Sequence, residues 1–444
     1  MSNNWSRIEI AKLIEERALF IGDGYRAKNS ELSSNGLPFA RAGDISSGFH
    51  FDGADCFPEK DLQRVGNKVS NPGDVVFTSK GTVGRFAFVR ANTPRFVYSP
   101  QLCFWRTLNE EKIDSRWLYY WMQSREFFAQ YKSVCGQTDM AEYVSLGDQR
   151  RMSLTLPPIS VQRNIAHVLG ALDDKIELNV RQNLTLQRMA VSVFKDWFMD
   201  FGPVHDKING LPTTDLNLKY IDLFPNTMAN SNLPIGWSIC NLAKLTSKIG
   251  SGTTPRGGKD VYVKEGVNLI RSQNVHDHQF LWNGLVKMSE EESERMRSVT
   301  VERNDILMNI TGDSILRTCV VDSSVLPARV NQHVLIIRAA KGIPPRYLHL
   351  YLVHPSTKAQ LLGNDAGGSR AAVTKGHLEA LPILLPSAAV LLAFENLTTP
   401  WFDSIANNSH ENRTLASLRN VLLPKLLSGE VCIKKAERII EAVL

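Results

Sequence analysis

The sequence predicts an α+β protein in which two similar mixed α/β lobes, related by an approximate two-fold axis, are joined by two long antiparallel helices. Three observations lead to this prediction: a heptad pattern in the middle of the chain, a second copy of it near the C-terminus, and an internal repeat. The predicted boundaries are 1–158 for the first lobe, 159–202 for the first long helix, 203–234 for a linker, 235–385 for the second lobe, and 386–444 for the second long helix and its tail.

The first long helix is predicted from Val161 to Met199, where seam residues recur at alternating steps of three and four. This is the spacing with which one helix packs along another. Ser160 is expected to cap its start, and Gly202-Pro203 to end it. Such a helix would extend for roughly 55–60 Å, which is longer than a compact domain requires. The predicted seam is Leu169, Leu172, Ile176, Asn179, Asn183, Leu186, Ala190, Val193 and Trp197.

The same seam returns near the C-terminus, with Asn408 and Asn412 at the positions that correspond to Asn179 and Asn183. An Asn in an apolar seam costs stability but fixes register and partner. We therefore expect the two helices to form an antiparallel coiled coil within the chain, and Pro400 to kink the second one. The second predicted seam is Ile405, Asn408, Asn412, Leu415, Arg419, Leu422 and Leu426.

Outside the helices, matching residues recur at a nearly constant separation from one end of the chain to the other. Trp5-Ser6 matches Trp237-Ser238, and Leu156-Pro157 matches Leu385-Pro386. Such a steady separation indicates a duplication with few insertions, and two copies are too few for a solenoid. Further matches join Gly24 to Gly252, Gly36 to Gly266, Arg41 to Arg271, Asp74 to Asp305, Arg85 to Arg317 and Gln101 to Gln332.

Each lobe is predicted to carry a sheet followed by a helix. Strands are expected at 74–79, 85–90 and 101–106 in the first lobe, and at 268–271, 305–310, 319–322 and 333–338 in the second. The helices are expected at 115–131 and 345–362, with the aromatic residues of the first in the core. Residues 203–234 are rich in Gly, Pro and Asn and are expected to form a polar linker.

Composition narrows the class of protein. The 444 residues are 43% apolar and 22% charged, which is ordinary for a folded chain of several domains, and a net charge of +6 permits an anionic partner without identifying one. The six cysteines form no CxxC pair, which favours a reducing compartment over a zinc site or a disulfide framework. No apolar signal or membrane span is expected, so the predicted location is the cytoplasm.

We find no established catalytic motif. The chain lacks a P-loop, a dinucleotide-binding glycine pattern, the Asn/Asp-Pro-Pro-aromatic tetrapeptide of amino-methylating enzymes, and a nuclease carboxylate cluster. His276-Asp277-His278 has no spaced partner for a metal, and Asp173-Asp174-Lys175 is expected to be a solvated helix face. We therefore expect no catalytic residue, cofactor or metal in this chain.

Three loops of each lobe combine glycine with hydrogen-bond donors of the kind that contact phosphates and base edges. Any one of them resembles an ordinary solvated turn, but their recurrence at matching places favours a binding role. The candidate DNA-binding residues are Tyr25, Arg26, Lys28, Arg41, Ser79, Lys80, Thr82, Arg85, Gln137 and Thr138 in the first lobe, and Thr254, Arg256, Lys259, Arg271, Asn309, Thr311, Arg317, Ser369, Arg370 and Lys375 in the second.

Two variable domains that begin with Trp, each followed by Leu-Pro and a long helix, resemble the DNA-specificity subunit of type I restriction–modification systems. The second lobe departs from this pattern at Thr311-Gly312-Asp313 and at Leu385-Pro386-Ser387. The segments that carry the resemblance are Gly73-Asp74-Val75-Val76, Ser79-Lys80-Gly81-Thr82-Val83-Gly84, Leu156-Pro157-Pro158-Ile159-Ser160-Val161-Gln162 and Leu422-Leu423-Pro424-Lys425-Leu426-Leu427-Ser428-Gly429-Glu430-Val431.

The resemblance implies that each lobe is a target-recognition domain for one half of a split, asymmetric double-stranded DNA sequence. The helices would set the gap between the halves and dock two methyltransferase subunits, which would use S-adenosylmethionine to methylate adenine. Two motor-nuclease subunits would join them in complexes that cleave DNA with ATP and Mg²⁺. Two alternatives remain open at this point: a standalone DNA methyltransferase or nuclease with an unrecognised site, and a structural protein whose lobes bind protein.

Overall fold

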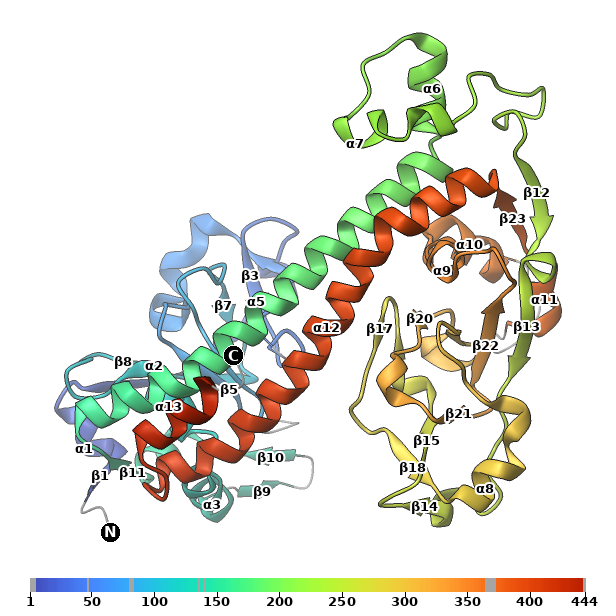
Figure 1. The fold of residues 1–444 in the computed structure, drawn as a ribbon. Helices are drawn as coiled ribbons and strands as arrows, with labels where there is room; N and C mark the ends of the chain where they lie inside the picture. Colours follow the sequence, from blue (N-terminus) through green and yellow to red (C-terminus); the bar gives the residue numbers. More distant parts are fainter. Residues whose placement is uncertain are drawn as a thin grey trace. The chain divides into compact units, whose positions relative to one another are not determined.

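The computed structural model describes residues 5–45, 48–79, 84–134, 136–138, 141–363 and 373–441. The chain divides into two compact units: the first unit is residues 1–179 and 410–444, and the second is residues 180–409. The division falls inside two 40-residue helices, α5 (Ile159–Phe198) and α12 (Ala388–Leu427), which Figure 1 draws in green and red. Each unit therefore contains one lobe and half of each long helix.

The first lobe is built on a four-stranded antiparallel sheet in the order β2 (Leu19–Asp23), β8 (Leu102–Thr107), β5 (Val75–Thr78), β6 (Phe86–Phe88). Beside it, β3 (Leu37–Ala40) pairs with β4 (Cys56–Phe57) and runs parallel to β7 (Val97–Tyr98). The first strand, β1 (Ser6–Glu9), pairs with the last, β11 (Ser153–Leu156). The lobe is completed by α1 (Ile10–Glu15), α4 (Leu146–Arg150) and the pair β9 (Gly136–Thr138) and β10 (Ala141–Tyr143).

The second lobe repeats this topology. Its main sheet has the order β13 (Thr246–Ser251), β22 (Val334–Ala339), β19 (Ile306–Asn309), β20 (Thr318–Val320), and β12 (Ser238–Asn241) pairs with β23 (Pro382–Leu385). Again a parallel pair stands beside it, formed by β15 (Val267–Ile270) and β21 (Ala328–Val330), with β18 (Val286–Met288) and β14 (Tyr262–Val263) on its other edge. The hairpin β16 (Val275–His276) and β17 (Gln279–Phe280) and the helix α8 (Glu290–Arg295) precede β19. The predicted pair of similar mixed α/β lobes is thus confirmed at the level of strand order.

The repeat extends to a buried ion pair that holds two strands of each sheet together. Arg106 donates two hydrogen bonds to Asp74 at 2.6 and 2.7 Å, and Arg338 donates two to Asp305 at 2.7 and 2.9 Å. Both carboxylates have no exposed surface. Because a buried carboxylate is costly unless it is paired, each pair needs both of its members.

Each sheet is followed by two helices, where the sequence predicted one. In the first lobe these are α2 (Ser115–Trp121) and α3 (Arg125–Val134), and in the second they are α9 (Pro345–Val353) and α10 (Pro355–Gly363). The prediction of one continuous helix was wrong because a new N-terminus is built at each break: Ser124 Oγ accepts the N–H of Phe127 at 3.2 Å, and Pro355 opens α10. Trp117, Tyr120 and Trp121 are buried, as expected.

The long helices begin and end close to the predicted positions. Ser160 lies inside α5 and does not precede it, so the predicted cap is wrong. Instead, the buried Gln162 anchors the helix start, donating to the carbonyl of Pro157 at 2.8 Å and accepting the N–H of Asp114 at 3.0 Å. Pro400 does not interrupt α12, which continues as one helix on both sides of it.

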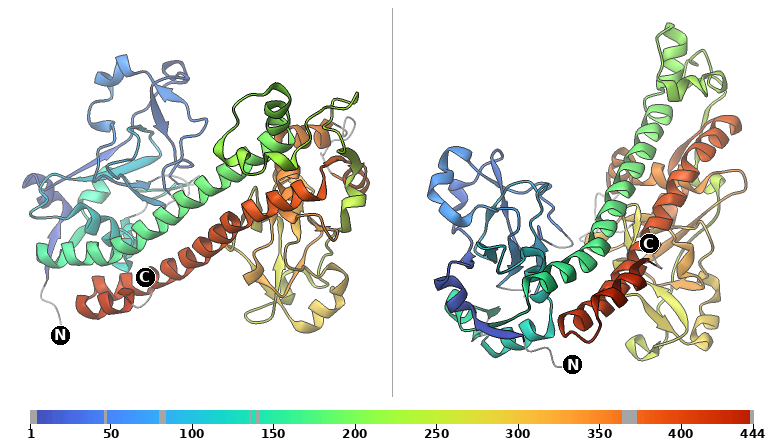
Figure 2. Two further views of the ribbon diagram at one scale, coloured as in Figure 1. Left: turned by 45° about the horizontal axis from the view of Figure 1, so that its top comes forward. Right: turned by 60° about the vertical axis from the view of Figure 1, so that its left-hand side comes forward.

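Within each unit the halves of α5 and α12 pack side by side, as both views of Figure 2 show. In the first unit Asn179 donates to Asn412 at 2.9 Å, and in the second Asn408 donates to Asn183 at 2.8 Å. The repeat relates Asn179 to Asn408 and Asn183 to Asn412, so these are the two pairings that an antiparallel pair of related helices requires. Leu172, Leu415 and Leu422 are buried in the core of the first unit, and Ile176 packs against this core. Ile405 packs against the core of the second unit, and Leu186 is half-buried.

Residues 203–234 are folded, which corrects the prediction of a polar linker. They include α7 (Asp215–Leu218) and almost all of α6 (Gly202–Asn209). Val204 and Phe224 are buried with the second unit's core, and the indole N–H of Trp197 donates to the buried Asn217 at 2.7 Å. The segment therefore caps the end of α5. In the first unit α13 (Ile433–Glu441) packs in a similar way, with Ala436 and Ile440 in the core.

The junction between helix and lobe in the first unit is an ion-pair network. Asp174 accepts hydrogen bonds from Arg116 at 2.6 and 2.9 Å and from Arg90, while Asp173 accepts from Arg419 at 2.7 Å and from the Tyr120 hydroxyl at 2.6 Å. Burial opposes ionisation of Asp174, but the bonds from the two arginines lower its pKa below the usual 3.8. The prediction of a solvated face was wrong, because these partners come from segments distant in the sequence.

The corresponding junction in the second unit is aromatic. Phe198 lies 4.9 Å from Tyr347 and 5.1 Å from Phe394, measured between ring centroids. The guanidinium of Arg346 lies 4.4 Å from the ring centroid of Phe402, and burial lowers the pKa of this arginine to about 10, so it remains charged at neutral pH. No helix in the described part of the chain combines the length and apolarity that a membrane span needs.

Candidate nucleic-acid interface

Four loops of the first lobe meet at one end of its sheets. They follow β2, β3 and β5 and connect β7 to β8. The N–H of Tyr25 donates to the carbonyl of Tyr98 at 2.7 Å, and the N–H of Ala42 donates to the side chain of Gln101 at 3.1 Å. The guanidinium of Arg85 donates to the carbonyl of Ala42 at 3.1 Å. These bonds join segments distant in the sequence into one surface, which we call the first loop cluster (residues 24–28, 41–45, 79, 84–85 and 99–101).

The second lobe brings the equivalent loops together. The N–H of Asn331 donates to the carbonyl of Ile270 at 3.0 Å, just as Ser99 donates to Ala40 in the first lobe. The side-chain amide of Asn309 donates to the carbonyl of Ser272 at 2.9 Å. We call this surface the second loop cluster (residues 252–256, 271–274, 309–317 and 331–333).

A glycine at the same place in each cluster allows two loops to approach closely. A Cβ atom added to Gly24 would lie 1.9 Å from the carbonyl oxygen of Ser99, and one added to Gly252 would lie 2.2 Å from that of Asn331. No side chain fits at these distances. The two matched glycines are therefore required by the way each cluster is built.

The candidates of the first lobe differ in exposure. Arg26 and Lys28 are exposed, and Tyr25 is half-buried with its ring edge-on to Phe57. Arg41 is 44% exposed and ion-paired to Asp55, Arg85 is half-buried, and Ser79 is buried and braces the loop against Gln101. Lys80 and Thr82 lie outside the described residues. Gln137 and Thr138 lie in β9, but their side chains are not among those described.

In the second lobe Thr254 and Arg256 are exposed, and Arg317 is half-buried. Thr311 is hydrogen-bonded to His333 at 2.8 Å, and Lys375 is ion-paired to Glu379 at 3.3 Å, outside the loop cluster. Asn309 has no exposed surface, and its amide supports the loops. Arg271 donates to the carbonyl of Gly284 at 2.5 Å. Ser369 and Arg370 lie outside the described residues, as does the side chain of Lys259.

Several residues that organise the clusters were not selected from the sequence. Gln101 had been matched to Gln332 in the repeat, but nothing in the sequence showed that its amide would accept the Ala42 N–H. His333 and Asp55 carried no local signal at all. Their roles come from contacts between distant loops, so only the fold could identify them.

His276-Asp277-His278 is a structural element. Asp277 accepts the N–H of Thr318 at 3.0 Å and is ion-paired to Lys358 at 2.6 Å. The ring of His278 lies 5.1 Å from that of His349, and burial lowers the pKa of both imidazoles. Among the described residues, no group of three or more His, Cys, Asp or Glu side chains is placed to hold a metal.

Comparisons with known proteins agree with this architecture. Residues 17–188 match the family model described as the type I restriction modification DNA specificity domain. The chain is 24% identical to the type I restriction enzyme HindI specificity subunit of Haemophilus influenzae, over 93% of this chain and 98% of that protein. It is 20% identical to the MjaIX specificity subunit of Methanocaldococcus jannaschii, over 85% of this chain and 82% of that protein.

Among solved structures, the S subunit of a type I restriction–modification system from M. genitalium aligns with 96% of this chain. The alignment covers 97% of that protein, with a TM-score of 0.55 and 12% sequence identity. At this level of identity the likeness shows a shared fold. The fold class predicted from the sequence is therefore confirmed.

Proposed function

Because the chain belongs to the family of type I restriction–modification DNA-specificity subunits, we propose that its two lobes each read one half of a bipartite, asymmetric double-stranded DNA target. The observation that carries this proposal is the loop cluster. Both lobes have one at the end of sheets with the same strand order, but the side chains of the two clusters differ. A common framework with different donors is what two unlike half-sites require.

Within each cluster, the burial of a residue indicates whether it contacts DNA or supports the loops. Arg26, Lys28 and Arg256 are exposed and can reach phosphates or base edges, whereas Ser79 and Asn309 are buried and hold the loops in place. The net charge of the whole chain is only +6. Since affinity for DNA depends largely on neutralised phosphates, partner subunits would supply much of the backbone contact.

We further propose that the pair of α5 and α12 sets the gap between the half-sites and docks two methyltransferase subunits. The Asn pairs fix the register of these helices, as a spacer requires. Leu184 and Met189 on α5 and Val421 on α12 are 46%, 42% and 52% exposed, so a partner subunit could contact them. This chain would contribute no catalytic residue.

On this proposal the cofactors belong to the partners. The methyltransferase subunits would bind S-adenosylmethionine, and two motor-nuclease subunits would bring ATP and Mg²⁺ where the complex also cleaves DNA. The complex would work in the cytoplasm.

Methylome sequencing of cells that carry the whole system tests the proposal. We expect one motif with two different half-sites, a fixed gap and a methylated adenine in each half. A continuous or palindromic motif would contradict it. The alternative, a standalone enzyme, is tested by incubating the purified chain with DNA and either S-adenosylmethionine or Mg²⁺; we expect no turnover, and turnover would support the alternative.

A further inference from the structure

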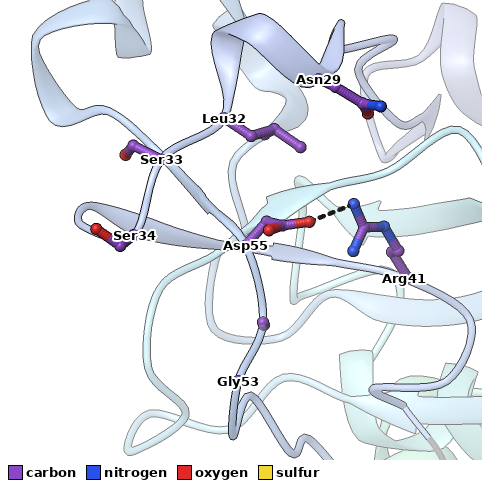
Figure 3. Close-up of a pocket in the computed structure, with 8 residues that line it drawn as sticks. Asn29, Leu32, Ser33, Ser34, Arg41, Gly53 and Asp55 are labelled. Atoms are coloured by element: carbon purple, nitrogen blue, oxygen red, sulfur yellow. Dashed lines mark hydrogen bonds and ion pairs between the residues drawn. The ribbon is translucent and has the colours of Figure 1, made fainter.

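An open pocket of about 660 Å³ lies beside the first loop cluster, and one side chain of the cluster lines it. Figure 3 shows Arg41 reaching toward Asp55, with Asn29, Ser33 and Ser34 around the same pocket. The guanidinium of Arg41 donates to Asp55 Oδ2 at 2.7 Å, and the two side chains are 44% and 52% exposed. The pair is therefore at the surface, where a ligand can reach it.

The backbone on both sides of this pair is fixed. The N–H of Arg41 donates to Asp44 at 2.7 Å, and the next residue, Ala42, is held by Gln101 and Arg85. Asp55 follows the turn at Gly53, and its carbonyl accepts the N–H of Phe39 at 2.8 Å. Because both main chains are anchored, the ion pair orients the Arg41 guanidinium in one direction.

The ion pair leaves most of the donors of Arg41 unused by Asp55. A guanidinium carries five N–H donors in a planar fork, and the bond to Asp55 uses one of them. A fork held by a carboxylate on one side presents parallel donors on another. Two parallel donors match a pair of acceptors, such as N7 and O6 of guanine in the major groove.

The charge of Asp55 favours a base over a phosphate as the group that Arg41 binds. Its carboxylate lies within hydrogen-bond distance of the guanidinium, so the pair as a whole is neutral. A phosphate that approached Arg41 would meet the negative charge of Asp55, which opposes binding. The acceptor edge of a base carries no net charge and pays no such penalty. The pair therefore suits base reading better than phosphate binding.

The matched arginine of the second lobe is held differently. Each guanidinium lies 5.8 Å from a ring centroid, that of Phe39 for Arg41 and that of Tyr262 for Arg271. Arg271, however, donates to the carbonyl of Gly284 at 2.5 Å, and its Nε is buried. Gln273 donates to the same carbonyl at 3.1 Å. Arg271 therefore holds a turn of its own lobe, and the two arginines have diverged in role.

We propose that Arg41 reads a guanine at one position of the half-site recognised by the first lobe, and that Asp55 is the positioning residue that orients it. This inference rests on the proposed function. Arg271 serves as its matched control, since it occupies the equivalent place and has no carboxylate partner among the residues that the structure describes.

The test uses the chain assembled with the methyltransferase subunits of its own system. Binding is measured on duplexes that carry each of the four base pairs at every position of the first half-site, for the unmodified chain and for R41A, D55N and R271A. Arg41→Ala should lower the preference for guanine at one position by about 10- to 100-fold and leave the second half-site unchanged.

Asp55→Asn keeps an oxygen that accepts from Arg41 but removes the negative charge. It should retain most of the guanine preference while binding to unrelated DNA becomes tighter and more sensitive to salt. Arg271→Ala should leave base preference in the first half-site unchanged, because Arg271 belongs to the second lobe. Thermal unfolding of each variant identifies any that have lost their fold. If R41A does not fold, the D55N variant still tests the inference.

Two results would overturn the inference: R41A that keeps every base preference of the unmodified complex, or D55N that leaves both base preference and nonspecific affinity unchanged. Either would leave the proposed function standing, because the unmodified complex would still select a bipartite target. If the unmodified complex selected no such target, the proposed function itself would fail.

Discussion

The two helix–lobe junctions have the same topology but are held by different chemistry. In the first unit, Asp173 and Asp174 on α5 bind Arg90, Arg116 and Arg419. In the second, rings of α5, α9 and α12 pack together around the buried Phe394. A duplicated backbone can therefore keep its strand order while its junction changes from ion pairs to aromatic packing. The two units should consequently respond differently to mutation and to pH.

The largest effect is expected from Phe394→Ala in the second unit. Phe394 has no exposed surface and contacts the rings of Trp197 and Phe198. Truncation should lower the free energy of unfolding of this unit by about 3–5 kcal/mol, because it leaves a cavity between rigid rings. Denaturant unfolding combined with hydrogen exchange measures the loss and locates it.

Leu392→Ala is the matched control, since Leu392 lies on the same helix and is 56% exposed. It should change stability by less than about 0.5 kcal/mol. An equal loss from both variants, or a loss located in the first unit, would contradict the assignment of the aromatic junction.

A smaller effect is expected from Asp173→Ala in the first unit. The Asp173 side chain is 11% exposed, and its removal leaves the Arg419 guanidinium and the Tyr120 hydroxyl without this acceptor. The loss should be about 2–3 kcal/mol. A double-mutant cycle with Arg419→Ala should show coupling, with the double variant less destabilised than the sum of the two single variants. Simple additivity would mean that the ion pair contributes nothing.

The smallest effect is expected from a change in pH, to which the stability of the two units should respond differently. Burial lowers the pKa of His278 and lowers that of His349 well below the ordinary 6.5. Below that value the unfolded chain binds protons that the folded unit does not, so stability falls as pH falls. Through His349 the second unit should lose up to about 1 kcal/mol between pH 6.5 and 5.5, with a smaller loss through His278.

The first unit should be unaffected over the same range. The pKa of Asp174 is lowered from 3.8, so its stabilising contribution is present above that value and is lost only at more acidic pH. Hydrogen exchange at pH 7.5 and 5.5 should show α9 and β20 opening first, and His349→Asn should reduce the difference. If the two units lost protection together, the histidine pair would not be the cause.

Long-period features were predictable from the sequence. The heptad spacing located α5 and α12 within a few residues, and it placed Asn179 and Asn412, which are hydrogen-bonded, on the seam. The separation between Gly24 and Gly252 anticipated the repeated topology. These features are local or periodic, so a single sequence displays them directly.

Contacts between distant segments were not predictable. Asp173 and Asp174 looked like a solvated face because the arginines that bind them are far away in the sequence. Asn309 was selected as a DNA-binding candidate because its loop is polar, and the sequence did not show that its amide would donate to the carbonyl of Ser272. Whether a polar side chain contacts solvent, ligand or its own backbone depends on the tertiary fold.

The central claim is that the paired helices hold two unlike readers a fixed distance apart on DNA. Removing residues 180–186 from α5 and the facing residues 405–411 from α12 deletes one heptad from each helix and preserves the seam. At about 1.5 Å per residue this shortens the pair by roughly 10 Å, or about three base pairs. Methylome sequencing should then show both original half-sites with a shorter gap, whereas the original gap would contradict the claim.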